Sequence, residues 1–239
     1  MMNIVIHKAE DRGFANHGWL QANHSFSFAQ FFDSEKIQFG ALRVLNDDVI
    51  APSMGFSTHA HDNMEIITIP LKGSLKHKDS MGNRWETIEV GEVQIMSAGS
   101  GLKHSEMNAK TDEYLSLFQI WIIPNKQNVV PRYDQQFFKA EDRAGKLQTL
   151  VTSMDGVENG LKIHQDAKLS RIDLKADESF TYKTKSDGHG TYVMIISGAV
   201  SIENNTLQSR DAIGVTSTDS FLINTTTDTQ LLFIEVPML

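Results

Sequence analysis

Residues 59–106 read HAHDNMEIITIPLKGSLKHKDSMGNRWETIEVGEVQIMSAGSGLKHSE, and the pattern within this stretch decides the fold. Runs rich in β-branched residues alternate with turn signals, and we predict strands over Glu65–Leu71, Ser74–His77, Trp85–Val90 and Val93–Met96. Strands at such spacing, separated by glycine-containing turns such as those at Gly73 and Gly91, indicate a β-sandwich or β-barrel. Pro70 cannot donate a ladder hydrogen bond, so we place it at a strand end, an edge or a bulge.

The pattern continues on both sides of this stretch. We predict a strand over Gln38–Leu45, ended by a turn at Asn46-Asp47-Asp48, and another over Glu113–Ile123. Further along, an apolar run over Tyr192–Ser197 is followed by Gly198 and a second short strand, in the same order as the elements around Gly73. An internal duplication of a β unit explains this repetition, although two generic hairpins could also resemble each other.

The length of 239 residues corresponds to about one to two typical domains. We predict two, comprising residues 1–135 and residues 136–239, because Pro124 and Pro131 close the first half and turn-rich sequence follows. The polar segment Gln135–Lys146 could hold a short helix. The expected fold class is therefore all-β with two barrel domains and few short helices.

Composition narrows the classes of function and the chemistry of any metal site. With 22 Lys+Arg against 30 Asp+Glu, the net charge is -8, and the absence of a basic run argues against direct nucleic-acid binding. There is no cysteine, so any metal must be bound through nitrogen and oxygen. Neither a signal-peptide pattern nor a run of about 20 apolar residues is present, and we expect a cytoplasmic protein without membrane association.

Two short motifs carry candidate ligands. His59 and His61 are two residues apart, and so are His104 and Glu106. Residues two apart on a strand point to the same face, so two such pairs on neighbouring strands of a barrel would converge on one point in its interior. Three imidazoles and a carboxylate suit Fe(II), Mn, Ni, Cu or Zn, whereas Ca and Mg prefer shells made entirely of oxygen.

The other interpretation of an isolated His-x-His is an ordinary polar strand, and the second pair is what favours a metal site. Glu65 has the same parity as His61 and would face the same way if the strand stays regular. It could then be a further ligand, but we expect it to orient a ligand histidine by hydrogen bonding. His77 lies between two lysines, which favours a solvated strand.

With these residues in place, the chain is similar to the pirin family of the cupin superfamily. The resemblance rests on His59-Ala60-His61, Glu65, Gly73, residues 77–83 (HKDSMGN), residues 91–101 (GEVQIMSAGSG) and His104-Ser105-Glu106. It is looser at the N-terminus and in the second half. The family commonly has a proline between the first two histidines, where this chain has Ala60.

The resemblance implies a bicupin, in which two jelly-roll barrels pack face to face and only the N-terminal barrel binds metal. The family's ligands fall on His59, His61, His104 and Glu106 of this chain. It also implies a divalent transition metal as cofactor, usually Fe(II), with Zn, Mn, Ni, Cu or Co as other candidates.

Bacterial members of the family resemble quercetin 2,3-dioxygenases, which open the flavonol ring and release carbon monoxide. The implied partners are a small flavonol-like aromatic substrate and dioxygen, with Glu106 as the catalytic base. The first alternative, suggested by eukaryotic members, is a redox-sensing iron protein that acts as a regulatory cofactor of a protein partner. The second, suggested by other cupins, is a metal-dependent hydrolase or isomerase that prefers Zn.

Overall fold

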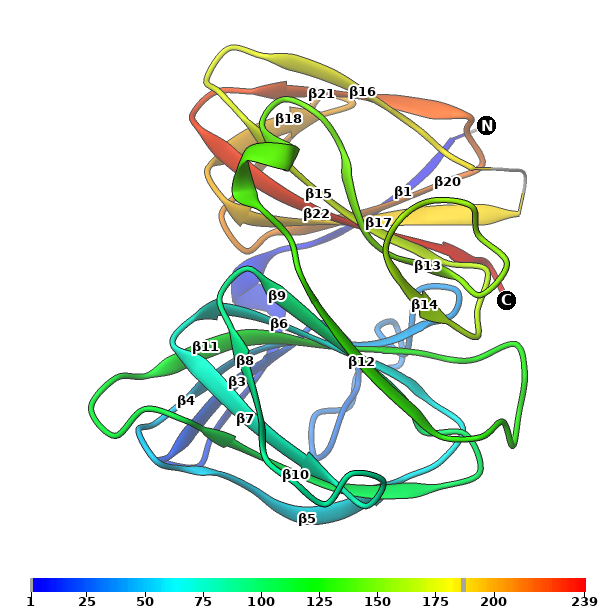
Figure 1. The fold of residues 1–239 in the computed structure, drawn as a ribbon. Coiled ribbons are helices and arrows are strands. Elements are labelled where there is room, and N and C mark those ends of the chain that lie inside the picture. Colours follow the sequence, from blue (N-terminus) through cyan, green and yellow to red (C-terminus); the bar gives the residue numbers. More distant parts are fainter. Residues whose placement is uncertain (1, 186–187) are drawn as a thin grey trace.

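The computed structural model describes residues 2–185 and 188–239, which form two β-barrels, each built from a large and a small sheet (Figure 1). The predicted all-β, two-barrel architecture is therefore confirmed. The described residues contain two short 3₁₀ helices, η1 (Ala9–Asp11) and η2 (Ala140–Arg143), and η2 lies within the segment expected to hold a short helix. No helix in these ranges is long and apolar enough to cross a membrane.

The first barrel contains residues 59–106, which carry both histidine motifs. Its small sheet has the order β5-β10-β7-β8, formed by β5 (Gly55–His61), β10 (Leu102–Asn108), β7 (Ser74–Asp79) and β8 (Glu86–Glu89). Its large sheet has the order β12-β9-β6-β11-β4-β3-β2, formed by β12 (Arg132–Phe137), β9 (Glu92–Ser97), β6 (Glu65–Lys72), β11 (Leu115–Ile122), β4 (Leu42–Ile50), β3 (Leu20–His24) and β2 (Gly13–Asn16).

The second barrel repeats this arrangement. Its small sheet, in the order β16-β21-β18-β19, contains β16 (Ser179–Lys183), β21 (Ser220–Thr225), β18 (Ala199–Ile202) and β19 (Asn205–Gln208). Its large sheet, in the order β1-β20-β17-β22-β15-β13-β14, contains β1 (Asn3–His7), β20 (Ala212–Thr216), β17 (His189–Ser197), β22 (Thr229–Pro237), β15 (Lys168–Leu174), β13 (Gln148–Ser153) and β14 (Leu161–Ile163). The small sheets of the two barrels are connected alike, as an internal duplication would produce.

The chain does not divide cleanly at one point. The N-terminal strand β1 pairs with β20 of the second barrel, before the chain enters the first barrel at β2. Strand β12 spans residue 135 and pairs with β9 of the first barrel. The boundary between residues 135 and 136 stays a prediction.

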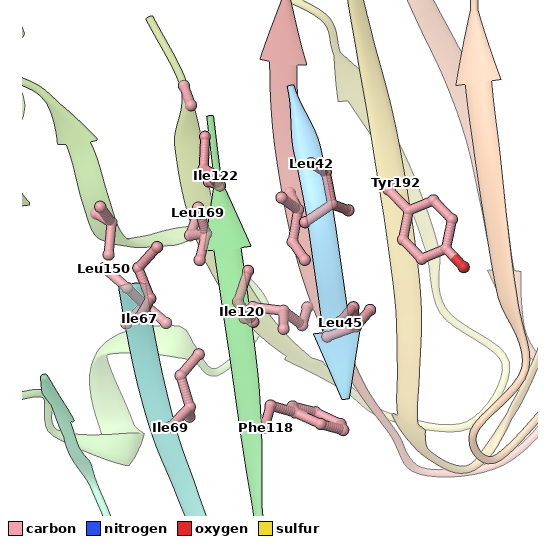
Figure 2. Close-up of a cluster of buried hydrophobic side chains, with 14 of the residues drawn as sticks. Leu42, Leu45, Ile67, Ile69, Phe118, Ile120, Ile122, Leu150, Leu169 and Tyr192 are labelled. Carbon is pink, nitrogen blue, oxygen red and sulfur yellow. The ribbon is translucent and has the colours of Figure 1, made fainter. Parts of the chain in front are cut away.

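The two large sheets pack face to face through a shared apolar core (Figure 2). Because side chains alternate across a strand, one set of residues on each strand of the first barrel faces the second barrel and the other set faces the barrel interior. The core side chains labelled in Figure 2 are Leu42, Leu45, Ile67, Ile69, Phe118, Ile120 and Ile122 from the first barrel and Leu150, Leu169 and Tyr192 from the second. The opposite faces of β4 and β11 are left to line the interior.

The prediction for β4 was wrong in an informative way. The strand runs from Leu42 to Ile50, and the expected turn at Asn46-Asp47-Asp48 lies in its middle. Asp47 faces the second barrel, where its carboxylate forms ion pairs with Arg12 and Arg210 at 3.6 and 3.2 Å. Asn46 and Asp48 have the other parity and line a cavity inside the first barrel. Tertiary partners therefore override the turn propensity of these polar residues.

Pro70 lies at a bulge, as expected. The pairing of β6 with β11 shifts register between Ser116 and Leu117, which face Lys72 and Pro70. Pairing of β6 with β9 covers Glu65–Thr68 and stops before the proline. The missing N–H of Pro70 is thus placed where the ladder is already interrupted.

Candidate metal centre

Neighbouring strands of the small sheet bring the predicted ligands together. Strands β5 and β10 are antiparallel, and His104 pairs directly with His59. The ring centroids of His59 and His61 lie 4.4 and 4.8 Å from that of His104. A bulge between His104 and Glu106 shifts the register by one residue, yet all four predicted residues line one cavity.

The histidine nitrogens point at one another. The Nε2 atoms of His61 and His104 are 2.9 Å apart, and candidate ligand atoms of His59, His61 and His104 all lie within 4.8 Å of one another. Nδ1 of His59 lies 2.8 Å from the carbonyl oxygen of Ser57, which can only accept, so Nδ1 carries the proton and Nε2 keeps its lone pair. Converging nitrogen lone pairs are the donor set that a transition-metal cation needs.

Burial keeps the imidazoles of His61 and His104 neutral. It lowers the pKa of His61 to about 4, with the neighbouring His59 as the next cause. It lowers the pKa of His104 to about 2, assisted by His59, His77 and His61. At neutral pH both rings are therefore uncharged, which is the form that binds metal.

Glu106 supplies an oxygen atom that fits a cation. Its side chain is buried, and Nε2 of Gln119 donates to Oε2 at 3.3 Å. Oε1 is also buried, and within the described residues it has no hydrogen-bond partner. Burial raises the pKa of Glu106 to about 7. A carboxylate oxygen of Glu106 lies within 4.8 Å of nitrogen atoms of His104 and His77, and it is not grouped with His59 and His61. Glu106 therefore lies on one side of the histidine cluster.

The cavity beside this cluster has apolar and polar walls. Its volume is about 220 Å³, and its apolar lining comes from Phe28, Phe56, Ile66, Leu117 and Trp121. On the large sheet, Asn46, Asp48 and Gln119 add polar groups. Burial, and then the charges of Asp47 and Glu106, raise the pKa of Asp48 to about 8.

The expectation for His77 was wrong. Its side chain is only 1% exposed, and it connects the cluster to Asp79. Nε2 of His77 is 3.2 Å from Oδ2 of Asp79, and Nδ1 of His77 is 3.4 Å from Nδ1 of His104. Because the carboxylate accepts from Nε2, Nδ1 of His77 accepts from Nδ1–H of His104, and Nε2 of His104 is left unprotonated towards the cluster. His77 pairs with Glu106 across β7 and β10. The lysines on both sides of His77 gave no sign of this pairing in the sequence.

Glu65 does not orient a ligand histidine, contrary to the sequence prediction. Asn63 has a left-handed φ of 44° in the turn between β5 and β6, which resets the parity on which the prediction relied. Oε2 of Glu65 accepts from the hydroxyl of Ser97 at 2.6 Å. Burial raises the pKa of Glu65 to about 7, against the opposing effects of that hydrogen bond and one from the backbone of His164 in the second barrel. Glu65 therefore faces the contact between the barrels.

Comparison with known proteins covers both barrels. The Pirin family model matches residues 6–122, and the model of the quercetinase C-terminal cupin domain matches residues 150–236. A protein of Escherichia coli K12 named quercetin 2,3-dioxygenase is 41% identical over 98% of this chain and 99% of its own. A pirin-like protein of Caulobacter vibrioides is 40% identical over 93% and 95% of the two chains. The crystal structure of a bacterial pirin from E. coli in complex with nickel(II) superposes with a TM-score of 0.93, at 37% identity, over 99% of this chain and 100% of that one.

Two such barrels in one chain, the first with a histidine cluster inside it, define a bicupin. At these identities and coverages, the chain belongs to the pirin family.

Proposed function

We propose that this chain is a metal-dependent dioxygenase that opens the ring of flavonols such as quercetin, with Fe(II) held by His59, His61, His104 and Glu106. The observation that carries the proposal is the convergence of three imidazoles and a buried carboxylate on one largely apolar cavity. The E. coli relative named quercetin 2,3-dioxygenase supports the activity, and the nickel complex of the bacterial pirin supports a divalent transition metal. These names also favour the dioxygenase over the redox-regulator alternative.

The chain's own residues have three tasks in this reaction. A bound divalent metal would act as a Lewis acid that lowers the pKa of a substrate hydroxyl. Glu106 accepts the proton of the flavonol 3-hydroxyl, and its raised pKa makes it a stronger base than an exposed carboxylate. Gln119 holds the carboxylate in place through Oε2. The apolar walls exclude water, so that dioxygen meets an electron-rich flavonolate in a dry cavity.

The proposal is tested by oxygen consumption of Fe(II)-loaded protein with quercetin, together with carbon monoxide release. Metal-free protein is the control. Uptake that requires both the metal and quercetin supports the proposal. Stoichiometric iron without oxygen uptake would contradict the dioxygenase proposal and favour the redox-regulator alternative.

Glu106→Gln is expected to lower kcat with quercetin by at least about 100-fold, the usual contribution of a general base, while much of the iron content is retained. Iron per chain and kcat are measured on the same sample. The matched control is Glu65→Gln, which alters another buried glutamate of this barrel that faces away from the cluster. Equal losses of iron and turnover in Glu106→Gln would make Glu106 a ligand only.

His77→Phe is expected to weaken metal affinity about 10- to 100-fold, the typical effect of removing a partner of a ligand histidine. Phenylalanine can keep the stacking of residue 77 on Tyr133 but cannot accept from Nδ1–H of His104. Competition with a chelator measures the affinity. His7→Phe replaces a buried histidine between the barrels, which hydrogen-bonds to Tyr192, and should leave the affinity unchanged. Equal affinities in the two variants would contradict the role of His77.

A further inference from the structure

The cavity has a polar wall on the side of the large sheet, of which the proposed chemistry uses only Gln119. The histidines and Glu106 come from β5 and β10 of the small sheet, whereas Asn46, Asp48 and Gln119 come from β4 and β11 of the large sheet. Two of these three already have partners. Oδ1 of Asn46 is 2.9 Å from Nδ1 of His24, and Gln119 donates to Glu106.

Asp48 is the member of this wall whose side chain has no hydrogen-bond partner among the described residues. Its side chain lines the cavity and is only 5% exposed. Oδ1 is buried, and the described part of the chain offers it no hydrogen bond. The adjacent Asp47 differs, because it is paired with Arg12 and Arg210 on the opposite face of the strand. A buried carboxyl group without a partner is unfavourable, so its presence needs a reason other than stability.

We propose that Asp48 positions the substrate by hydrogen bonding to a ring hydroxyl other than the one that faces the histidine cluster. This inference rests on the proposed function and narrows its substrate class to flat aromatic molecules with hydroxyl groups on more than one ring. Such a molecule would place its rings against Phe28, Phe56 and Trp121, with polar groups at both ends. A hydroxyl is suitable because it can both donate to and accept from a carboxyl group.

The size of the cavity agrees with this class of ligand. At about 220 Å³ it is smaller than the roughly 300–1,000 Å³ of typical small-molecule sites, so it suits one flat ring system rather than a bulky ligand. The half-exposed side chains of Phe28, Phe56 and His59 mark where the rest of a three-ring flavonol would leave the cavity. A polar anchor inside a tight, mostly apolar cavity fixes orientation more than it adds affinity.

The experiment compares two ligands that differ only in their remote hydroxyls. Quercetin and 3-hydroxyflavone share the 3-hydroxyl and the 4-carbonyl, but the second lacks the other ring hydroxyls. Dissociation constants are measured anaerobically with metal-loaded wild type, Asp48→Ala and Asp48→Asn. We expect Asp48→Ala to weaken quercetin binding about tenfold or more and to change 3-hydroxyflavone binding less than twofold. Asp48→Asn keeps a hydrogen-bonding group and should retain most of the preference.

Asp47→Asn is the matched control, because it removes a buried carboxylate from the same strand on the face away from the cavity. It should leave the preference for quercetin at the wild-type value. The proposal is overturned if the wild type binds quercetin no more tightly than 3-hydroxyflavone, or if Asp48→Ala weakens the binding of both ligands equally. It is also overturned if Asp48→Asn loses as much quercetin affinity as Asp48→Ala does. Oxygen uptake in the same samples separates the two claims. If Asp48 discriminates between the two ligands but no oxygen is consumed, the dioxygenase proposal is contradicted and the role of Asp48 in binding is still supported.

Discussion

His104→Ala is expected to abolish both metal retention and oxygen uptake with quercetin. His104 is the central member of the cluster, since its ring is the nearest neighbour of both His59 and His61. It also belongs to both groups of candidate ligands and is the point at which Asp79 and His77 reach the cluster. Removing this imidazole takes away one proposed ligand and the ring whose Nε2 lies 2.9 Å from Nε2 of His61. Metal per chain after desalting and initial rates in an oxygen electrode measure the two effects.

The control for this variant is His7→Ala. His7 is also a buried imidazole, but it lies between the barrels and hydrogen-bonds to the hydroxyl of Tyr192 at 2.8 Å. Its loss should reduce stability without changing metal content. Stoichiometric metal and wild-type oxygen uptake in His104→Ala would show that the cluster is not the metal site. Thermal unfolding of both variants distinguishes a lost ligand from a lost fold.

Much of the candidate site could be predicted from pairs of residues that are two positions apart in the sequence. Such pairs share a face of a strand, so His59 with His61 and His104 with Glu106 could be predicted to act together. That β5 and β10 are neighbours, with His104 opposite His59, depends on a strand pairing between residues far apart in the sequence. The resemblance to a known family implied that the four residues share one site, but neither it nor the local pattern gave the pairing of these strands.

The failures lie where tertiary contacts override local pattern. Glu65 needed a continuous strand after His61, and the left-handed turn at Asn63 moved it to the other face of the barrel wall. The burial of His77 was not predicted, because the lysines on both sides of it, whose side chains point the other way, indicated a solvated strand. Asn46-Asp47-Asp48 has the composition of a turn, yet it forms the middle of β4. Sequences tend to break local rules at functional sites, which agrees with the role proposed for Asp48.

Phe118→Ala is expected to lower the free energy of unfolding by about 3–5 kcal/mol, the usual cost of truncating a buried phenylalanine. Phe118 lies on β11, a central strand of the large sheet, and its ring is fully buried in the core shared by the two barrels (Figure 2). The guanidinium of Arg210, from the second barrel, lies 5.1 Å from the ring centroid. The substitution therefore opens a cavity at the contact between the barrels. Urea unfolding at equilibrium measures the change.

Phe32→Ala is the matched control, because Phe32 is 77% exposed and its truncation should change stability by about 0.5 kcal/mol or less. Similar losses in the two variants would contradict the assigned importance of the shared core. The shape of the transition carries further information. Because one apolar cluster contains residues of both barrels, both variants should still unfold in a single transition. Two separate transitions in Phe118→Ala, with one in the wild type, would mean that this ring couples the unfolding of the first barrel to that of the second.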